Sequence, residues 1–126
     1  METWQDISKD SLLAAKALHR EGYFRSSVSR AYYSAYCAAT HEIVQKLTTF
    51  TYGWNNPSHQ KVATYVQNNL TLPRAKKDIL VSLINTLRQF REDADYRPHV
   101  EIDAQIAEDC VRHAISVHIE LWGGTP

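Results

Sequence analysis

Apolar residues recur along most of this chain at steps of three and four residues, and no stretch alternates convincingly with a period of two. Such spacing puts apolar side chains on one face of an α-helix, so it predicts helices rather than strands. Glycine and proline, four of each, gather at a few places and separate the helical stretches. The pattern predicts five helices, at residues 4–21, 24–46, 58–69, 73–95 and 102–122.

Three of these helices carry apolar stripes at helical spacing. In the first helix the stripe is Trp4, Ile7, Ser11, Ala14 or Ala15, and Leu18. In the fourth helix it is Ile79, Leu80, Leu83, Leu87 and Phe90. In the fifth helix it is Ile102, Ile106, Cys110, Ala114 or His113, Val117 and Leu121. We expect the helices to bury these faces against one another.

The residues at the predicted helix ends support this division. We expect Gly22 to end the first helix and Gly123-Gly124 to end the fifth, while Ser58 caps the third and Pro73 opens the fourth. Residues 48–57 form a polar and aromatic loop. Four long helices and one short helix, joined by short loops, predict an all-α protein. We expect an antiparallel up-and-down bundle in a single domain, residues 1–126.

The charge balance narrows the classes of partner. Lysine plus arginine number 14 and aspartate plus glutamate number 14, so the net charge is zero. Broad, sequence-blind binding of nucleic acid needs an excess of cations, whereas a local cationic cleft is compatible with this balance. The densest basic cluster, Arg74, Lys76 and Lys77, is open to two interpretations, a solvated face or an RNA contact.

Two cysteines, Cys37 and Cys110, lie in predicted helices without a CxxC motif, which predicts reduced, buried thiols and a cytoplasmic protein. We expect neither a signal peptide nor a membrane span. Cys37 and His41 share a helix face, but the sequence fixes no third ligand, so no metal site is predicted. Phosphate-binding glycine loops are absent, and we predict no cofactor.

Several short segments resemble HEPN domains when taken together. Gly22-Tyr23, Arg30-Ala31-Tyr32-Tyr33 and Cys37-Ala38-Ala39 are similar to the second helix of one HEPN branch. Pro57-Ser58-His59 resembles the start of that branch's third helix. Arg91-Glu92-Asp93-Ala94-Asp95-Tyr96 resembles its Arg-x-x-Ala-Asp-Tyr segment. The segments occur in the family's order and span nearly the whole chain.

The resemblance implies a helical bundle that usually forms a homodimer and belongs to a toxin–antitoxin or defence module. It also implies a nucleotidyltransferase as partner protein, encoded by a neighbouring gene. Toxic members of the family are metal-independent ribonucleases with an arginine and a histidine separated by four to six residues. This chain departs from that signature, because four residues separate Arg91 from a tyrosine, Tyr96, and the next histidine is His99. Arg112 and His118 have a suitable spacing, but their side chains should point in different directions from one helix.

The candidate site combines the residues that carry the family resemblance with the chemistry of phosphate. Cleavage of RNA without a metal needs a base, an acid and a cation, and histidine and arginine suit these roles. The candidate catalytic residues are therefore Arg91, Tyr96 and His99, where His99 replaces the missing histidine. The candidate substrate-binding residues are Arg88, Arg30, Tyr33 and Asp95.

A structural role is open for the same residues. Arg91 and Asp95 are spaced for a salt bridge within one helix. The tyrosines of the second helix suit core or dimer packing as well as base stacking. Three functions follow: an RNA- or nucleotide-binding component of a toxin–antitoxin or defence module, an active metal-independent endoribonuclease toxin, or a non-catalytic interaction module for a nucleotidyltransferase. The central geometric prediction is that the guanidinium of Arg91 meets the tyrosine rings of the second helix beside a shared cleft.

Overall fold

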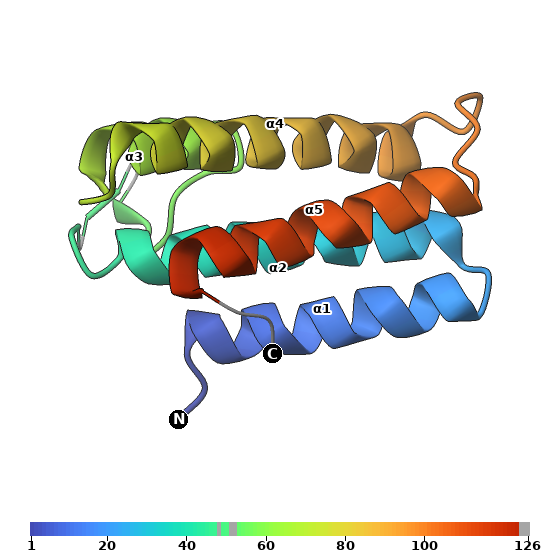
Figure 1. Cartoon of the computed structure of the whole chain (residues 1–126), viewed down its shortest axis with the longest axis horizontal. Helices are drawn as coiled ribbons and strands as arrows, with labels where there is room; N and C mark the ends of the chain where they lie inside the picture. The colour runs from blue at the N-terminus through green and yellow to red at the C-terminus, as the bar shows by residue number, and fades with distance from the viewer. Residues whose placement is uncertain (48, 51–52, 124–126) are drawn as a thin grey trace.

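The described residues of this computed structural model form five α-helices (Figure 1). The structure describes residues 1–47, 49–50 and 53–123. The helices are α1 (Trp4–Arg20), α2 (Phe24–Ile43), α3 (Val62–Asn69), α4 (Arg74–Tyr96) and α5 (Ala104–Trp122). No strand occurs within the described ranges. The prediction of an all-α bundle with four long helices and one short helix is confirmed.

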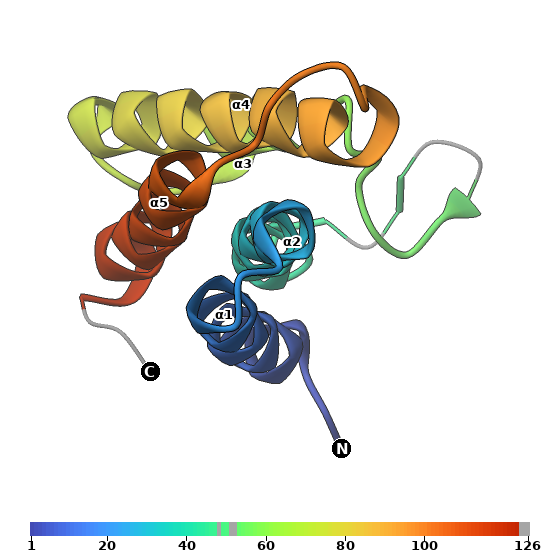
Figure 2. The same ribbon diagram turned by 90° about the vertical axis from the view of Figure 1, so that its right-hand side faces the viewer.

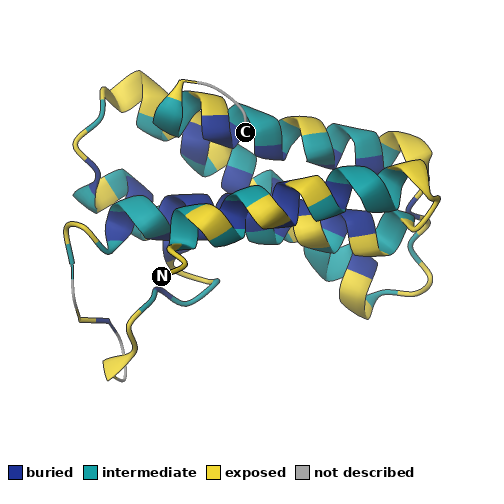
Figure 3. Ribbon diagram, turned by 90° about the horizontal axis from the view of Figure 1, so that it is seen from below, coloured by how far each residue is buried: buried dark blue, intermediate teal, exposed yellow. Residues whose placement is uncertain are grey.

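Helix α2 lies at the centre and packs against each of the other four helices. In Figure 2, α1 and α2 are seen nearly end-on, α5 lies beside them, and α4 crosses over them. Small residues make this central position possible, because a thin surface lets neighbouring helices approach closely. The fully buried small residues of α2 are Ser27, Ala31, Ser34, Ala35, Ala38 and Ala39. Figure 3 shows buried positions where helices face one another and exposed positions on the outer surfaces.

A buried polar cluster, here called the serine–histidine cluster, joins α1, α2 and α5. It consists of Ser8, Ser34 and His118, all fully buried. The Ser8 hydroxyl donates to the Ser34 carbonyl at 2.6 Å, and the Ser34 hydroxyl donates to the Ser8 carbonyl at 2.8 Å. Nε2 of His118 lies 3.0 Å from the Ser8 hydroxyl oxygen and 2.9 Å from that of Ser34. Three elements are thus fastened by hydrogen bonds that water does not reach.

The cluster fixes the protonation of His118. Each serine hydroxyl has one proton and already donates it to a carbonyl, so Nε2 of His118 must be the donor to both oxygens. The other nitrogen, Nδ1, is buried and has no hydrogen-bond partner in the described part of the chain. Burial, with smaller contributions from Lys9 and Lys16, lowers the pKa of His118 to about 4. His118 is therefore a neutral, structural histidine at pH 7.

Arg25 of α2 holds the turn between α4 and α5. Its guanidinium donates to backbone carbonyls of Asp93, Ala94, Arg97, Pro98 and Val100. The last carbonyls of a helix have no partner within the helix, so this contact satisfies some of them. It also fixes the end of α4 against α2, and this end carries the candidate site residues.

Several predicted helix boundaries need correction. Helix α2 ends at Ile43 rather than at residue 46, where a short turn follows. Helix α3 begins at Val62 rather than at Ser58, because the Ser58 carbonyl accepts from the amides of Lys61 and Val62 in a separate turn. Ser58 therefore does not cap α3 with its side chain.

The two ends of α5 also differ from the prediction. Helix α5 begins at Ala104 rather than at residue 102, and the side chain of Asp103 caps it by accepting from the amide of Ile106. Gly123 ends α5 in a left-handed conformation, with φ of 78°, as expected for a terminal glycine. Gly124 lies outside the described residues, as do Thr48, Thr51 and Tyr52 of the predicted loop.

Two predicted stripes are rotated about their helices. In α1, Leu12 and Ser8 are fully buried, although the predicted apolar stripe did not include them. In α4, Ile79 was predicted in the core but is 46% exposed, while Ile84 is buried in its place. Each helix contacts more than one neighbour, so the buried face is wider than a single line of apolar residues. None of the described helices is both long and apolar enough to cross a membrane.

Candidate functional site

A cleft of about 200 Å³ opens between α2, α4 and the segment that precedes α3; we call it the α2–α4 cleft. Its lining residues are Ser29, Arg30, Tyr32, Tyr33, His59 and Arg91. Four of these, at positions 29, 30, 32 and 33, come from α2, where residues three or four positions apart lie on the same side of the helix. The cleft therefore combines cations, phenol rings, a hydroxyl and an imidazole.

Arg91 forms the α4 wall of the cleft. Its Cζ lies 5.7 Å from the centre of the Tyr32 ring and 5.3 Å from that of Tyr96. Its Nε is 2.9 Å from Oδ2 of Asp95, in the predicted salt bridge within the helix. The prediction that the Arg91 guanidinium meets the tyrosine rings of α2 beside a cleft is confirmed.

The other predicted substrate-binding residues surround this contact. Arg30 is exposed, and its Cζ lies 5.6 Å from the centre of the Tyr33 ring. Asp95 accepts from Arg91 and also from the Ser29 hydroxyl at 3.2 Å, so it links α4 to α2. Arg88 does not line the cleft, and it pairs with Glu92 at 3.4 Å.

Of the three predicted catalytic residues, Arg91 and Tyr96 contact each other, whereas His99 is not among the residues that line the cleft. Tyr96 is 67% exposed and contacts Arg91 from outside the lining of the cleft, with its hydroxyl 3.4 Å from Nη2. His99 is exposed in the turn after α4 and is not among the residues that line the cleft. Arg25 binds the carbonyls of Arg97, Pro98 and Val100 on both sides of it. The structure thus places Arg91 at the cleft and His99 away from its lining.

The imidazole of the cleft belongs to His59 instead. Its Nδ1 lies 2.7 Å from the Tyr32 hydroxyl, and its ring centre is 4.3 Å from that of Tyr36. The Tyr36 hydroxyl donates to the Pro57 carbonyl at 2.5 Å, which holds the segment before α3 against α2. Tyr36 is itself almost fully buried, so its hydrogen bond to Pro57 is shielded from water.

Burial and neighbouring cations set the charge states in the cleft. Desolvation lowers the pKa of His59, and the positive charges of Arg91 and Arg88 lower it further. Desolvation also raises the pKa of Tyr32, and this effect outweighs the opposing influence of the two arginines. At pH 7 the cleft therefore holds a neutral imidazole, a neutral phenol and charged guanidinium groups.

Sequence reasoning did not select His59 as a site residue. The motif Pro57-Ser58-His59 was part of the family resemblance, and this was the one available signal. No helical period connects His59 with α2, because the position of this segment depends on hydrogen bonds to tyrosine hydroxyls. His59 precedes Arg91 in the chain, so the family's spacing from an arginine forward to a histidine does not lead to it.

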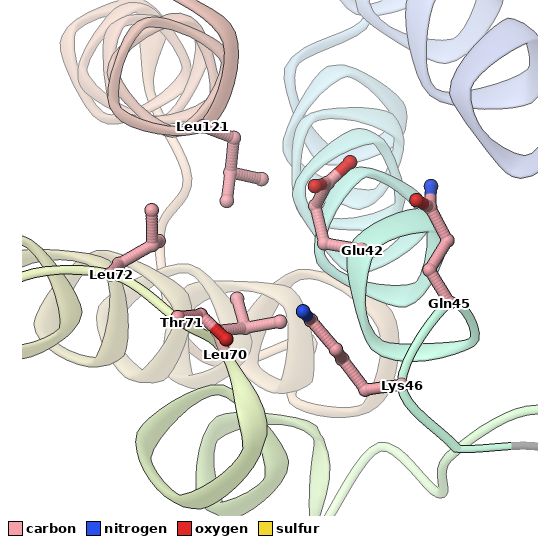
Figure 4. A pocket seen from close by; sticks show the side chains of 7 residues that line it. All are labelled: Glu42, Gln45, Lys46, Leu70, Thr71, Leu72 and Leu121. Carbon is pink, nitrogen blue, oxygen red and sulfur yellow. The ribbon is translucent and has the colours of Figure 1, made fainter.

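A second pocket, of about 260 Å³, lies near the C-terminal ends of α2 and α5 and beside the link between α3 and α4 (Figure 4). Its lining residues are Glu42, Gln45, Lys46, Leu70, Thr71, Leu72 and Leu121. Glu42 accepts from the indole of Trp122 at 3.0 Å, so its carboxylate is already engaged. The pocket contains none of the predicted site residues, and its one cation, Lys46, faces leucines and a carboxylate.

Thiol and metal chemistry find no support in the described residues. Cys37 and Cys110 are both free and buried, and burial raises the pKa of each thiol to about 12. Within residues 1–47, 49–50 and 53–123, no group of three or more histidine, cysteine, aspartate or glutamate side chains is arranged to hold a metal ion.

Comparison with known protein families gives a match over nearly the whole chain. The sequence model of the HEPN domain matches residues 1–120, which is nearly the whole chain. No curated protein and no solved structure matches the chain significantly.

Proposed function

Because the chain belongs to the HEPN domain family, we propose that it binds RNA or a nucleotide through the α2–α4 cleft. The observation that carries this proposal is the stacking of two guanidinium groups on two tyrosine rings around one opening. Arg91 lies over Tyr32, and Arg30 lies over Tyr33. Guanidinium groups bind phosphate through a planar fork of donors, and the half-buried Tyr33 offers an aromatic side chain for a base beside them.

The size of the cleft indicates what part of a ligand it holds. At about 200 Å³ it is smaller than the pockets of about 300–1,000 Å³ that enclose whole small-molecule ligands. A phosphate and part of the adjoining sugar therefore fill it, while the base lies near the half-buried Tyr33 at the rim. A single strand meets these requirements better than a duplex, since its bases are free to stack.

Family membership supports a wider role. We propose that the protein is one component of a toxin–antitoxin or defence module, that it forms a homodimer and that a nucleotidyltransferase is its partner protein. The zero net charge is compatible with self-association, because it provides little electrostatic repulsion between copies. Light scattering at micromolar concentration tests the dimer, and a monomer would contradict it. Co-purification with the product of a neighbouring gene tests the partner.

The binding proposal is tested with single-stranded RNA and two cleft variants. Arg91→Gln and Arg30→Gln each remove one guanidinium, and each should weaken binding by about tenfold. Arg112→Gln is the matched control, because Arg112 pairs with Glu108 within α5 as Arg91 pairs with Asp95 within α4. Fluorescence anisotropy at several salt concentrations gives the affinities, and circular dichroism confirms that each variant is folded.

Two results would contradict this proposal. If Arg112→Gln weakens binding and the cleft variants do not, RNA binds elsewhere on the protein. If no RNA or nucleotide binds to the wild-type protein, the non-catalytic interaction module becomes the better description, with the nucleotidyltransferase as the sole partner.

Metal-independent cleavage of RNA is the second candidate function, and His59 is the observation that favours it. A neutral imidazole beside Arg91 can accept the proton of a 2′-hydroxyl while the 2′-oxygen attacks phosphorus. The 5′-oxygen then leaves and takes a proton from water, while the imidazolium returns its proton to the solvent, which gives a 2′,3′-cyclic phosphate and a 5′-hydroxyl. Cleavage of RNA by the purified protein in EDTA, lost in His59→Ala and kept in His99→Ala, would support it. Intact RNA after prolonged incubation would exclude it.

A further inference from the structure

We propose that the α2–α4 cleft recognises the terminal phosphate of a nucleotide or RNA strand, and that His59 takes up a proton when this phosphate binds. This inference rests on the proposed function, since it assumes that the cleft binds phosphate. It adds the kind of phosphate, a terminal monoester rather than an internal diester. It also assigns a role to an imidazole that the nucleotide-binding proposal does not use.

The first argument is the charge of the empty cleft. Arg91 is paired with Asp95, and the nearby Arg88 is paired with Glu92. Arg30 has no carboxylate within 4.0 Å in the described part of the chain, so the cleft carries about one uncompensated positive charge. An internal phosphodiester, with a single negative charge, would already balance it. A terminal phosphate carries about −1.5 to −2 at pH 7, so it leaves up to about one further negative charge to be matched.

The second argument is the position of His59. The imidazole lines the same cleft as Arg30 and Arg91, so a phosphate bound there is close to all three groups. Nδ1 is engaged with the Tyr32 hydroxyl, while no partner occupies Nε2 among the described residues. Nε2 is therefore the nitrogen available to donate to a phosphate oxygen. Protonation of His59 would supply the second positive charge.

The hydrogen bond to Tyr32 tolerates both forms of His59. A hydroxyl can donate to Nδ1 of a neutral imidazole and can accept from Nδ1 of a charged one. The phenol stays protonated in either case, because burial raises the pKa of Tyr32. The imidazole can thus change charge without losing the contact that positions it.

The groups around His59 explain the direction of the coupling. Tyr32 and Tyr36 of α2 are neutral, and Arg30 of α2 and Arg91 and Arg88 of α4 are cations. The acids Asp95 and Glu92 are bound to two of those arginines rather than to His59. On its own segment, the nearest charged residue in sequence is Lys61. In the free protein this environment favours the neutral imidazole, and a bound dianion between Arg91 and His59 reverses the preference.

Coupling of this kind is reciprocal. If phosphate binding raises the pKa of His59, protonation of His59 must tighten phosphate binding by the same factor. The affinity for a terminal phosphate should therefore fall as pH rises above 6.5, by at most about tenfold per pH unit. Measurements are made above pH 6.5 because the second pKa of the phosphate itself is about 6.

The first measurement compares RNA ends. Four single-stranded oligonucleotides of one sequence carry a 5′-phosphate, a 3′-phosphate, both phosphates or hydroxyl ends only, and inorganic phosphate serves as a competitor. We expect about tenfold tighter binding of at least one phosphorylated oligonucleotide than of the hydroxyl-ended one. The position of the effective phosphate identifies the strand end, and strong competition by inorganic phosphate shows that the cleft binds the phosphate group itself.

The second measurement counts protons. Isothermal titration calorimetry at pH 7 in buffers of different ionisation enthalpy should show uptake of a substantial fraction of a proton per bound terminal phosphate. His59→Gln should abolish this uptake and most of the pH dependence, while retaining some binding through Arg30 and Arg91. His113→Gln is the matched control, since its Nδ1 bonds to a carbonyl of its own helix on α5.

The outcomes separate this inference from the proposed function. If phosphorylated and unphosphorylated RNA bind equally and Arg91→Gln weakens both, the nucleotide cleft stands and the terminal-phosphate inference is wrong. If His59→Gln takes up as many protons as the wild type, the role of His59 is wrong. If no RNA and no phosphate binds, both proposals fail together.

Discussion

Two histidines of this protein meet hydroxyl groups of α2 in different surroundings. His118 is fully buried in the serine–histidine cluster, between Ser8 and Ser34. His59 is half-buried and bonds to the hydroxyl of Tyr32 at the edge of the α2–α4 cleft. In both cases, burial is the main reason that the pKa lies below the ordinary value for histidine.

The difference between them lies in what adjoins the ring. Around His118 the described neighbours are serine oxygens at Nε2 and the indole of Trp122, with ring centres 5.0 Å apart. Around His59 there are a cavity and the guanidinium of Arg91. A lowered pKa therefore does not by itself mark a functional histidine, because structural burial produces the same shift. His59 differs from His118 because it lines a cavity and lies near the cation Arg91.

The largest predicted effect is acid destabilisation through His118. The unfolded chain protonates this imidazole near pH 6.5, whereas the folded protein does so near pH 4. Between these values the unfolded state binds more protons, so stability is lost as pH falls through this window. The loss attributable to His118 is at most about 3 kcal/mol.

Urea unfolding at pH 7 and at pH 4.5 measures this loss. His118→Gln keeps an N–H donor for the serines but cannot titrate, so the part of the loss caused by His118 should disappear in this variant. His113→Gln, on the same helix, should keep the full loss. An equal loss in the wild type and in His118→Gln would show that His118 is not the group responsible.

A pair of serine substitutions compares how much the serine–histidine cluster and the α2–α4 cleft contribute to stability. Ser34→Ala removes a buried acceptor of His118 and a buried donor to the Ser8 carbonyl, so it should reduce the free energy of unfolding by about 1–3 kcal/mol. Ser29→Ala, earlier on α2, removes a half-buried hydroxyl that binds Asp95, and should change stability by less than about 0.5 kcal/mol. Denaturation of both variants at pH 7 gives the comparison, and equal losses would mean that both regions contribute to stability alike.

The elements of the fold could be predicted because their signals are local. Three- and four-residue periodicity gives the helices, and glycine and proline give most of the breaks between them. The buried face of each helix was harder to predict, as Ile79 and Leu12 show. A helix with several neighbours buries a broad surface, and periodicity alone does not say which edge of that surface is covered. The reciprocal bonds of Ser8 and Ser34 also gave no signal, since two isolated serines reveal no partner along the chain.

The site was predictable only where it lies on regular helices. Arg91, Arg30 and Tyr33 occupy positions that helical spacing fixes, and the structure brings them to one cleft. His59 lies in an irregular segment held by tyrosine hydroxyls, so its place depends on tertiary contacts. His99 was chosen for its nearness to Arg91 in sequence, but the turn that carries it is held by Arg25.

The smallest predicted effect concerns the electrostatic link between Arg91 and His59. Arg91→Gln removes a positive charge that disfavours the imidazolium, so the pKa of His59 should rise while that of His118 stays unchanged. The free energy of unfolding should change by no more than about 1 kcal/mol, because the partly exposed salt bridge to Asp95 contributes little to stability.

Titration of the imidazole resonances by nuclear magnetic resonance follows both histidines in one sample. Arg112→Gln removes the same charge from α5 and should leave the pKa of His59 where it was. A pKa of His59 that does not respond to Arg91→Gln would mean that the guanidinium does not act on the imidazole. The cleft would then be a second packed region rather than a charged site, and the contrast between the two histidines would be lost.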